Sequence, residues 1–130
     1  MQKIIIASGP LIVEDEKVLL NKHGDTAFWK FCGGRVEDFS QDLIENARRK
    51  AKEEMGIEIE IQNLEPFITH AQKETPEGKI DVILVHYLAE RIGKINPGKD
   101  IREWNWLETK NLPEDLGPNI RPALEHFGFL

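Results

Sequence analysis

The chain has 130 residues, and this length predicts a single domain spanning residues 1–130. Hydrophobic residues make up 40% of the sequence and charged residues 31%, a composition that fits a folded globular protein and excludes a disordered one. The formal net charge of −6 argues against a broad basic face, so we expect no long nucleic acid as a partner.

The sequence also lacks the marks of membrane and secreted proteins. No apolar run extends over the roughly 20 residues that a membrane-spanning helix needs, so no membrane partner is expected. The N-terminus has neither the length nor the small-residue cleavage site of a signal peptide. The single cysteine, Cys32, cannot form an internal disulfide, which fits a reducing compartment. We therefore expect a cytoplasmic enzyme or binding domain.

Apolar stretches predict a series of strands along the chain. They occupy residues 4–6, 11–13, 18–20, 28–31, 57–61, 80–88 and 104–107. The polar residues 14–16 between two of these stretches predict a hairpin. Residues 57–61 alternate apolar with charged residues, which is the period of a half-exposed strand.

One long helix is predicted from about Ser40 to Met55, and a short one over residues 120–127. Ser40 or Asp42 can cap the long helix, and Gly56 stands where a helix often ends in the left-handed conformation. Its apolar residues recur every four positions and form one narrow stripe; they are Leu43, Ala47, Ala51 and Met55. This order of strands and helices favours a mixed sheet with helices packed on it, hence an α/β protein.

The segment 29–57 contains the features that point to chemistry. Gly33 and Gly34 lack Cβ atoms, so their backbone groups can approach a ligand closely. On the predicted helix, Glu53 and Glu54 lie on one side, with Glu54 at the edge of the apolar stripe. Neighbouring carboxylates repel one another unless a cation lies between them, and hard divalent ions prefer oxygen ligands. A metal held there could activate water and neutralise a diphosphate.

A purely structural explanation of the same charges is also open. Paired glutamates are common on solvated helix surfaces. Arg49 stands four residues from both Glu45 and Glu53, which is the spacing of ordinary helix ion pairs. The charge pattern alone therefore does not decide between a metal site and a solvated surface.

The sequence from Gly33 to Ile57 resembles the Nudix box. Residues 33–37 (GGRVE) and 49–57 (RKAKEEMGI) follow the family pattern G-x5-E-x7-R-E-U-x-E-E-x-G-U, in which U is aliphatic. Residues 29–34 (WKFCGG) resemble the usual family entry into the box. The strands on either side also suit the family. The resemblance implies a Nudix-like α/β/α sandwich with a central mixed β-sheet.

The resemblance also implies a hydrolase that binds Mg²⁺ or Mn²⁺. The usual substrate is a nucleoside diphosphate linked to another moiety, a nucleotide-type small molecule that is cleaved by attack of water on phosphorus. By position, Glu53 and Glu54 match the metal-binding glutamates, and Arg49 matches the arginine that braces the loop. The backbone at Gly33 or Gly34 matches the region that approaches the phosphates and adds a carbonyl to the metal shell. Homodimers are frequent in the family, so the resemblance leaves a homodimer open.

Four features depart from the family pattern. Lys50 replaces the glutamate after the arginine, which often serves as a metal ligand or as the base. Because a protonated lysine cannot bind metal, and Lys50 stands within reach of Glu53 and Glu54, the site has at least one carboxylate fewer. The other departures are Gln41 in place of the first box glutamate, Cys32 in place of proline, and one extra residue between Gly34 and Arg49.

Two outcomes of the Lys50 replacement are open. Other carboxylates can compensate, with Glu37 as a supplementary metal ligand and Asp100 or Glu103 as the base. Alternatively, the domain binds a nucleotide or phosphate ester and hydrolyses it slowly or not at all. A further alternative is a nucleotide-sugar hydrolase, which cleaves at the sugar carbon with a histidine base in a late loop. Residues 95–101 contain no histidine, which counts against that variant.

The remaining polar and aromatic residues have weaker signals. Lys30 and Arg35, beside the glycines, are candidate phosphate contacts, and a solubilising role is the alternative. The four histidines are predicted to be structural or surface residues. The three tryptophans are predicted to lie in the core, although they could stack a nucleobase. Cys32 is predicted to be a buried, inert thiol.

Overall fold

The structure, a computed structural model, describes residues 3–130. Within this range no helix is both long enough and apolar enough to cross a bilayer. Strands and helices follow one another in the order β1 (Ile4–Leu11), β2 (Val13–Glu14), β3 (Lys17–His23), β4 (Gly34–Arg35), α1 (Leu43–Met55), β5 (Glu58–Ile61), β6 (Phe67–Thr75), β7 (Gly78–Ile92), β8 (Ile101–Glu108) and α2 (Ile120–His126).

The strands form two sheets. The larger sheet has the order β4–β1–β7–β5, with β6 also paired to β7, and the smaller one has the order β2–β3–β8. β1 and β7 are parallel along the whole of β1, whereas the other pairs of named strands are antiparallel. The predicted mixed β-sheet is therefore confirmed.

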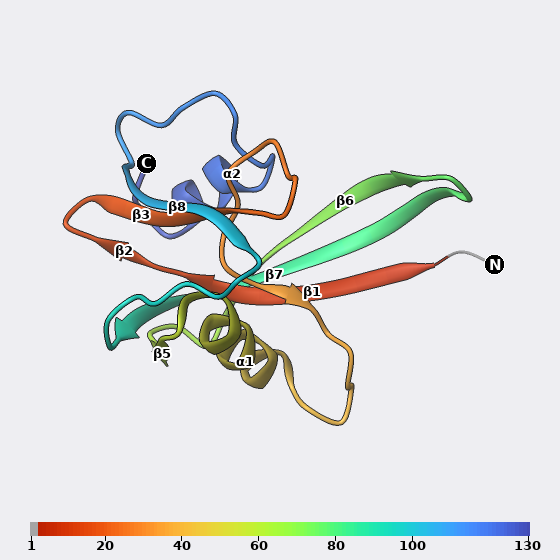
Figure 1. Ribbon diagram of the computed structural model, residues 1–130, viewed down its shortest axis with the longest axis horizontal. Coiled ribbons are helices and arrows are strands. Elements are labelled where there is room, and N and C mark those ends of the chain that lie inside the picture. The colour runs from red at the N-terminus through yellow and green to blue at the C-terminus, as the bar shows by residue number, and fades with distance from the viewer. Residues whose placement is uncertain (1–2) are drawn as a thin grey trace.

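The two helices lie on opposite sides of the sheets (Figure 1). One core lies on the α1 side and consists of Ile12, Leu19, Cys32, Ala47, Ala51, Met55, Ile57, Ile59, Val85, Tyr87 and Ala89. The other lies on the α2 side and consists of Leu11, Val18, Leu20, Trp29, Phe31, Ile120, Ala123 and Leu124. This layered arrangement confirms the predicted α/β/α sandwich.

Helix α1 begins and ends where its capping residues predict. The Asp42 side chain accepts a hydrogen bond from the backbone nitrogen of Glu45 at 2.8 Å. At the other end, Gly56 adopts the left-handed conformation with φ of 68°. Ser40 is not the cap, because its hydroxyl donates to Asp38 at 2.6 Å. The helix therefore starts at Leu43, three residues later than the earliest predicted position.

The structure differs from the predicted strands in three places. β1 continues through Gly9 and Pro10, which lie between two separately predicted stretches. Residues 28–31 form no strand and make only isolated bridges, in which Lys30 pairs with Asn21 and Trp29 with Leu116. Strand β6 was not predicted, because most of its side chains lie outside the core and its hydrophobic pattern is weak.

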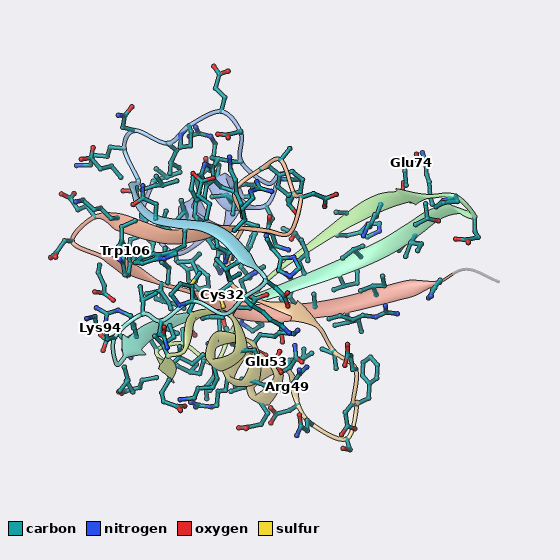
Figure 2. The ribbon with its side chains drawn as sticks, in the orientation of Figure 1. Cys32, Arg49, Glu53, Glu74, Lys94 and Trp106 are labelled. Atoms are coloured by element: carbon teal, nitrogen blue, oxygen red, sulfur yellow. The ribbon has the colours of Figure 1, made fainter. Side chains whose placement is uncertain are left out.

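β6, the start of β7 and the start of β1 extend away from the two helices (Figure 1). Figure 2 shows Glu74 near the outer end of this extension, whereas Cys32 lies between the sheet and α1. Arg49 and Glu53 lie on α1, far from the extension (Figure 2). The outer end of the extension therefore lies away from α1, whereas Ile6 at its base accepts a hydrogen bond of 2.8 Å from the backbone nitrogen of Val36 in the loop.

His86 of β7 is a buried histidine. Only 6% of the residue is exposed, and its ring packs against Phe31 with the ring centroids 4.7 Å apart. Among residues 3–130, its Nδ1 atom has no hydrogen-bond partner. Burial, assisted by the charge of Lys30, lowers the pKa of His86 from 6.5 to about 3. His86 is thus a neutral core residue, in agreement with the structural role predicted for it.

We predict that His86 makes the protein less stable as the pH falls below about 6.5. There the unfolded chain binds a proton that the folded chain does not, so this residue lowers the free energy of unfolding by about 1.4 kcal/mol per pH unit, down to the folded-state pKa. For His86→Leu we expect about 2 kcal/mol less loss of stability between pH 7 and pH 5. Urea unfolding at the two pH values measures this difference, and equal losses in both proteins would contradict it.

Candidate active site

The loop with Gly33 and Gly34 crosses β1 at backbone contact distance. A Cβ atom on Gly9 would lie 1.9 Å from the carbonyl oxygen of Cys32, and one on Gly33 would lie 2.8 Å from that of Ser8. Gly33 also has φ of 152°, in the region that favours glycine. The two backbones can therefore meet only because both positions lack a side chain. Gly34 then begins β4, which pairs with β1.

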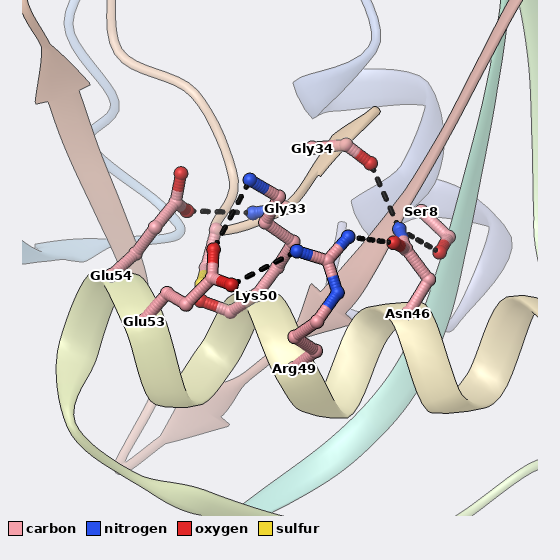
Figure 3. A network of polar contacts seen from close by, with 9 residues as sticks. Ser8, Gly33, Gly34, Asn46, Arg49, Lys50, Glu53 and Glu54 are labelled. Atoms are coloured by element: carbon pink, nitrogen blue, oxygen red, sulfur yellow. Dashed lines mark hydrogen bonds and ion pairs between the residues drawn. The ribbon is translucent and has the colours of Figure 1, made fainter. Parts of the chain in front are cut away.

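Asn46 links α1 to this loop and to β1. It is 2% exposed, and its Nδ2 atom donates to Ser8 Oγ and to the carbonyl oxygen of Gly34, both at 2.9 Å. Arg49 donates to Asn46 Oδ1 at 2.6 Å and to Glu53 Oε1 at 2.9 Å (Figure 3). Arg49 is therefore connected to the loop through Asn46. Sequence reasoning assigned no role to Asn46; the available signal was its place on the same side of the helix as Glu53.

Glu54 contacts the loop directly. Its Oε1 atom accepts a hydrogen bond of 2.9 Å from the backbone nitrogen of Gly33, while its other carboxylate oxygen points away from that contact (Figure 3). Burial, and then the charge of Glu54, raises the pKa of the neighbouring Cys32 thiol well above its ordinary value. Cys32 is therefore a neutral, buried thiol, in agreement with the inert role predicted for it.

Glu53 is shared between two cations. Its Oε1 atom lies 2.9 Å from Arg49 Nη1, and its Oε2 atom lies 3.3 Å from Lys50 Nζ. Burial acts to raise the pKa of Glu53, but the hydrogen bonds from Arg49 and Lys50 outweigh it and lower the pKa below its usual value. Glu53 is therefore ionised at neutral pH.

Lys50 lies over the Gly-Gly loop. A Cβ atom on Gly34 would lie 2.6 Å from Lys50 Cε and 3.1 Å from Lys50 Nζ. The absence of a side chain at Gly34 thus makes room for the lysine. Its side chain is only 20% exposed, so the ammonium group is held close to Glu53 and to the loop.

Lys50, Glu53 and Glu54 line a pocket of about 290 Å³ beside the C-terminal half of α1. Its lining consists of His23, Lys50, Glu53, Glu54, Gly98, Lys99, Asp100 and Ile101. Backbone hydrogen bonds hold the late segment in place, from Gly98 to the carbonyl of Glu54 at 2.9 Å and from Gly24 to that of Asp100 at 3.0 Å. Three carboxylates and two lysines from distant parts of the sequence therefore meet in one pocket.

The structure brings together some of the predicted site residues and not others. Glu53, Glu54 and Asp100 line the pocket. Arg35 and Glu37 are exposed on β4 and in the loop after it, and Glu103 is exposed on β8, opposite Lys22. These last three predicted site residues are outside the pocket lining that the described residues form.

Sequence reasoning missed two residues of the lining, His23 and Lys99. His23 enters the pocket because β3 pairs with β8, which puts His23 opposite Ile101. A pairing between segments so far apart in the sequence cannot be predicted from the spacing of neighbouring residues. For Lys99, the nearness of Asp100, a candidate base, was the available signal.

Comparison with known proteins identifies the family. The family model of the NUDIX domain matches residues 5–127. The chain belongs to the NUDIX hydrolase family. A search of curated protein sequences found no significant match.

Several solved structures share the fold. The MutT NUDIX hydrolase from Burkholderia pseudomallei is 23% identical, with 95% of this chain and 98% of that chain covered and a TM-score of 0.77. The E. coli ORF135 protein is 26% identical, with 97% and 89% covered and a TM-score of 0.69. An ADP-ribose pyrophosphatase from Streptococcus suis is 24% identical, with 93% and 87% covered and a TM-score of 0.68.

NUDIX hydrolases generally use divalent metals, and the pocket has suitable donors. Glu53, Glu54 and Asp100 supply oxygen atoms of the kind that Mg²⁺ prefers, and Mg²⁺ keeps several of its waters. Within residues 3–130, however, no group of three or more acidic, histidine or cysteine side chains is close enough to hold a metal by itself. The residues therefore fit an ion that substrate phosphates help to hold, and not one enclosed by the protein alone.

We predict that Gly9→Ala destabilises the protein by about 3 kcal/mol, at the upper end of the usual range for overpacking, because the new Cβ atom would overlap the backbone of Cys32. Gly24→Ala is the control. Its Cβ atom would meet nothing within 4 Å, and its positive φ costs only about 1 kcal/mol. Chemical denaturation of both variants measures the difference. Equal destabilisation would mean that the backbone contact at Gly9 is not tight.

Proposed function

We propose that this NUDIX protein hydrolyses a nucleoside diphosphate linked to another moiety and uses Mg²⁺ or Mn²⁺ as its cofactor. The products would be a nucleoside monophosphate or a similar phosphate. The observation that carries this proposal is the pocket beside α1, where Glu53 and Glu54 occur together with Asp100 next to the Gly-Gly loop.

The lysines of the pocket are the proposed contacts of the diphosphate. Lys50 and Lys99 both line it, and an ammonium group can donate to several phosphate oxygens. The amide of Gly33 already donates to Glu54, so the loop backbone offers fewer donors than its glycines suggest. Arg35 and the backbone of Gly34 remain proposed substrate contacts.

Glu53 and Glu54 are the proposed metal ligands, with Glu37 and the carbonyl oxygen of Gly34 as supplementary ones. A bound divalent ion supplies a Lewis acid that neutralises phosphate charge and assists the attacking water. Glu54 suits this role because the Gly33 amide holds one of its oxygens and leaves the other directed elsewhere (Figure 3). For Glu53 to join, its carboxylate must use lone pairs that its contacts with Arg49 and Lys50 leave open, against the opposing charge of these two cations.

Asp100 is the proposed base that accepts the proton of the attacking water. It lies in the pocket, whereas Glu103, the other predicted candidate, lies on β8 outside the lining. A base must come within hydrogen-bond distance of the water, and a residue that lines the pocket is better placed for this than an exposed residue outside it. The location of Asp100 therefore favours it over Glu103.

A second function, nucleotide binding with little or no hydrolysis, is favoured by one contact. The ammonium group of Lys50 lies 3.3 Å from Glu53 and competes with a metal for that carboxylate.

One observation also favours the alternative of a nucleotide-sugar hydrolase. His23 lies in the pocket beside residues 98–101, so the argument that considered the histidine-free segment 95–101 alone no longer applies. Product analysis distinguishes cleavage at phosphorus from cleavage at the sugar carbon.

We predict that Glu54→Gln lowers metal-dependent turnover at least about 100-fold, because it removes the charge of a proposed metal ligand, whereas the amide oxygen of glutamine can still accept the hydrogen bond from Gly33. A panel of nucleoside diphosphate derivatives, assayed for phosphate products with Mg²⁺ and with Mn²⁺, measures the effect. Glu53→Gln is tested in parallel. Glu58→Gln is the matched control, since Glu58 pairs with Lys52 and does not line the pocket. Unchanged turnover in both Glu53→Gln and Glu54→Gln would contradict the proposal.

The variant Lys50→Glu distinguishes a hydrolase from a domain that only binds nucleotides. It restores the carboxylate that the family pattern has at this position. Turnover that appears only in this variant would mean that the natural protein is a nucleotide-binding domain. Turnover in the wild-type protein that the substitution leaves unchanged would mean that another group already supplies the missing function.

A further inference from the structure

Lys50 lies where a carboxylate is usual in the family, and its contacts hold its positive charge in the pocket. Its side chain runs over Gly34, and its Nζ atom lies 3.3 Å from Glu53 Oε2 (Figure 3). The side chain is 20% exposed. The charge is therefore a fixed part of the site.

Glu53 is not a partner of Lys50 alone. The same carboxylate also accepts a hydrogen bond of 2.9 Å from Arg49, so two cations meet one anion. An ammonium group has three donors, and contact with Glu53 needs only one of them. Lys50 thus retains donors that can face the pocket, where Lys99 adds a second ammonium group beside the carboxylates of Glu54 and Asp100.

We propose that Lys50 acts as a built-in cation, so that the protein binds a diphosphate group without a divalent ion and needs the ion only for hydrolysis. This inference deepens the proposed function and rests on it for the nature of the ligand. Because Lys50 is covalently attached, chelators cannot remove it. Its charge also opposes a free divalent ion near Glu53, so the ion binds well only together with the diphosphate.

The test is calorimetric titration with inorganic pyrophosphate, once in excess EDTA and once with Mg²⁺. For the wild-type protein we expect binding in EDTA. For Lys50→Gln we expect that binding to weaken by roughly 10-fold to 100-fold, the range for loss of a hydrogen bond to a charged group. Lys52→Gln is the matched control. Lys52 is on the same helix, and its substitution removes the same charge, but it pairs with Glu58 outside the pocket. We therefore expect the affinity for pyrophosphate in EDTA to be unchanged in this variant.

A second variant displaces Lys50 without changing any charge. In Gly34→Ala the new Cβ atom would lie 2.6 Å from Lys50 Cε, so the ammonium group must move. Gly34 has no positive φ, so the backbone itself tolerates alanine. We expect weaker binding in EDTA here too, and thermal unfolding confirms that each variant is folded. If Lys50→Gln does not fold, this variant alone decides.

Three results would overturn the inference: wild-type binding that requires Mg²⁺, no binding in either condition, or equal affinities in Lys50→Gln and Lys52→Gln. Hydrolysis of the nucleotide panel is measured separately. Lys50-dependent binding without any hydrolysis would refute the proposed function and support the inference. Hydrolysis combined with strictly Mg²⁺-dependent binding would do the reverse.

Discussion

The contact between α1 and the Gly-Gly loop determines the geometry of the whole site. The loop lies against β1 only because Gly9 and Gly33 have no side chains, and this brings polar backbone groups into a buried place. Such groups must find hydrogen-bond partners. Asn46 and Glu54 supply them, at the carbonyl of Gly34 and the amide of Gly33. The position of the acidic helix face relative to the loop follows from these two bonds.

Local features of the sequence were sufficient to predict α1 and the box. The Asp42 cap, the terminal Gly56 and the stripe that includes Ala47 and Ala51 are all set by neighbours within a few residues, and the structure confirms them. The composition of the pocket depends instead on long-range pairing. His23 lies in it because β3 pairs with β8, which no local pattern encodes. Strand β6 was missed for a different reason: its polar side chains project outside the core, so its hydrophobic pattern is weak.

Lys50 makes this NUDIX site different from the family pattern in its charge. The helix and its caps are those that the sequence predicts, yet the carboxylate of Glu53 has two cationic neighbours. A site of this kind can attract phosphate by itself and has less attraction for a free metal ion. We therefore infer that the protein's own lysines bind the diphosphate. The divalent ion is assigned to the chemical step.

The most direct test is to locate the metal by paramagnetic broadening in the ¹⁵N-labelled protein. Substoichiometric Mn²⁺ is added in the presence of inorganic pyrophosphate, with Mg²⁺ as the diamagnetic control. The account predicts that the amide signals of Gly33, Gly98 and Asp100 are lost first, since these residues lie in or beside the pocket. Broadening centred on a different pocket, around Asp15 and Glu108, or spread evenly over the chain, would contradict it.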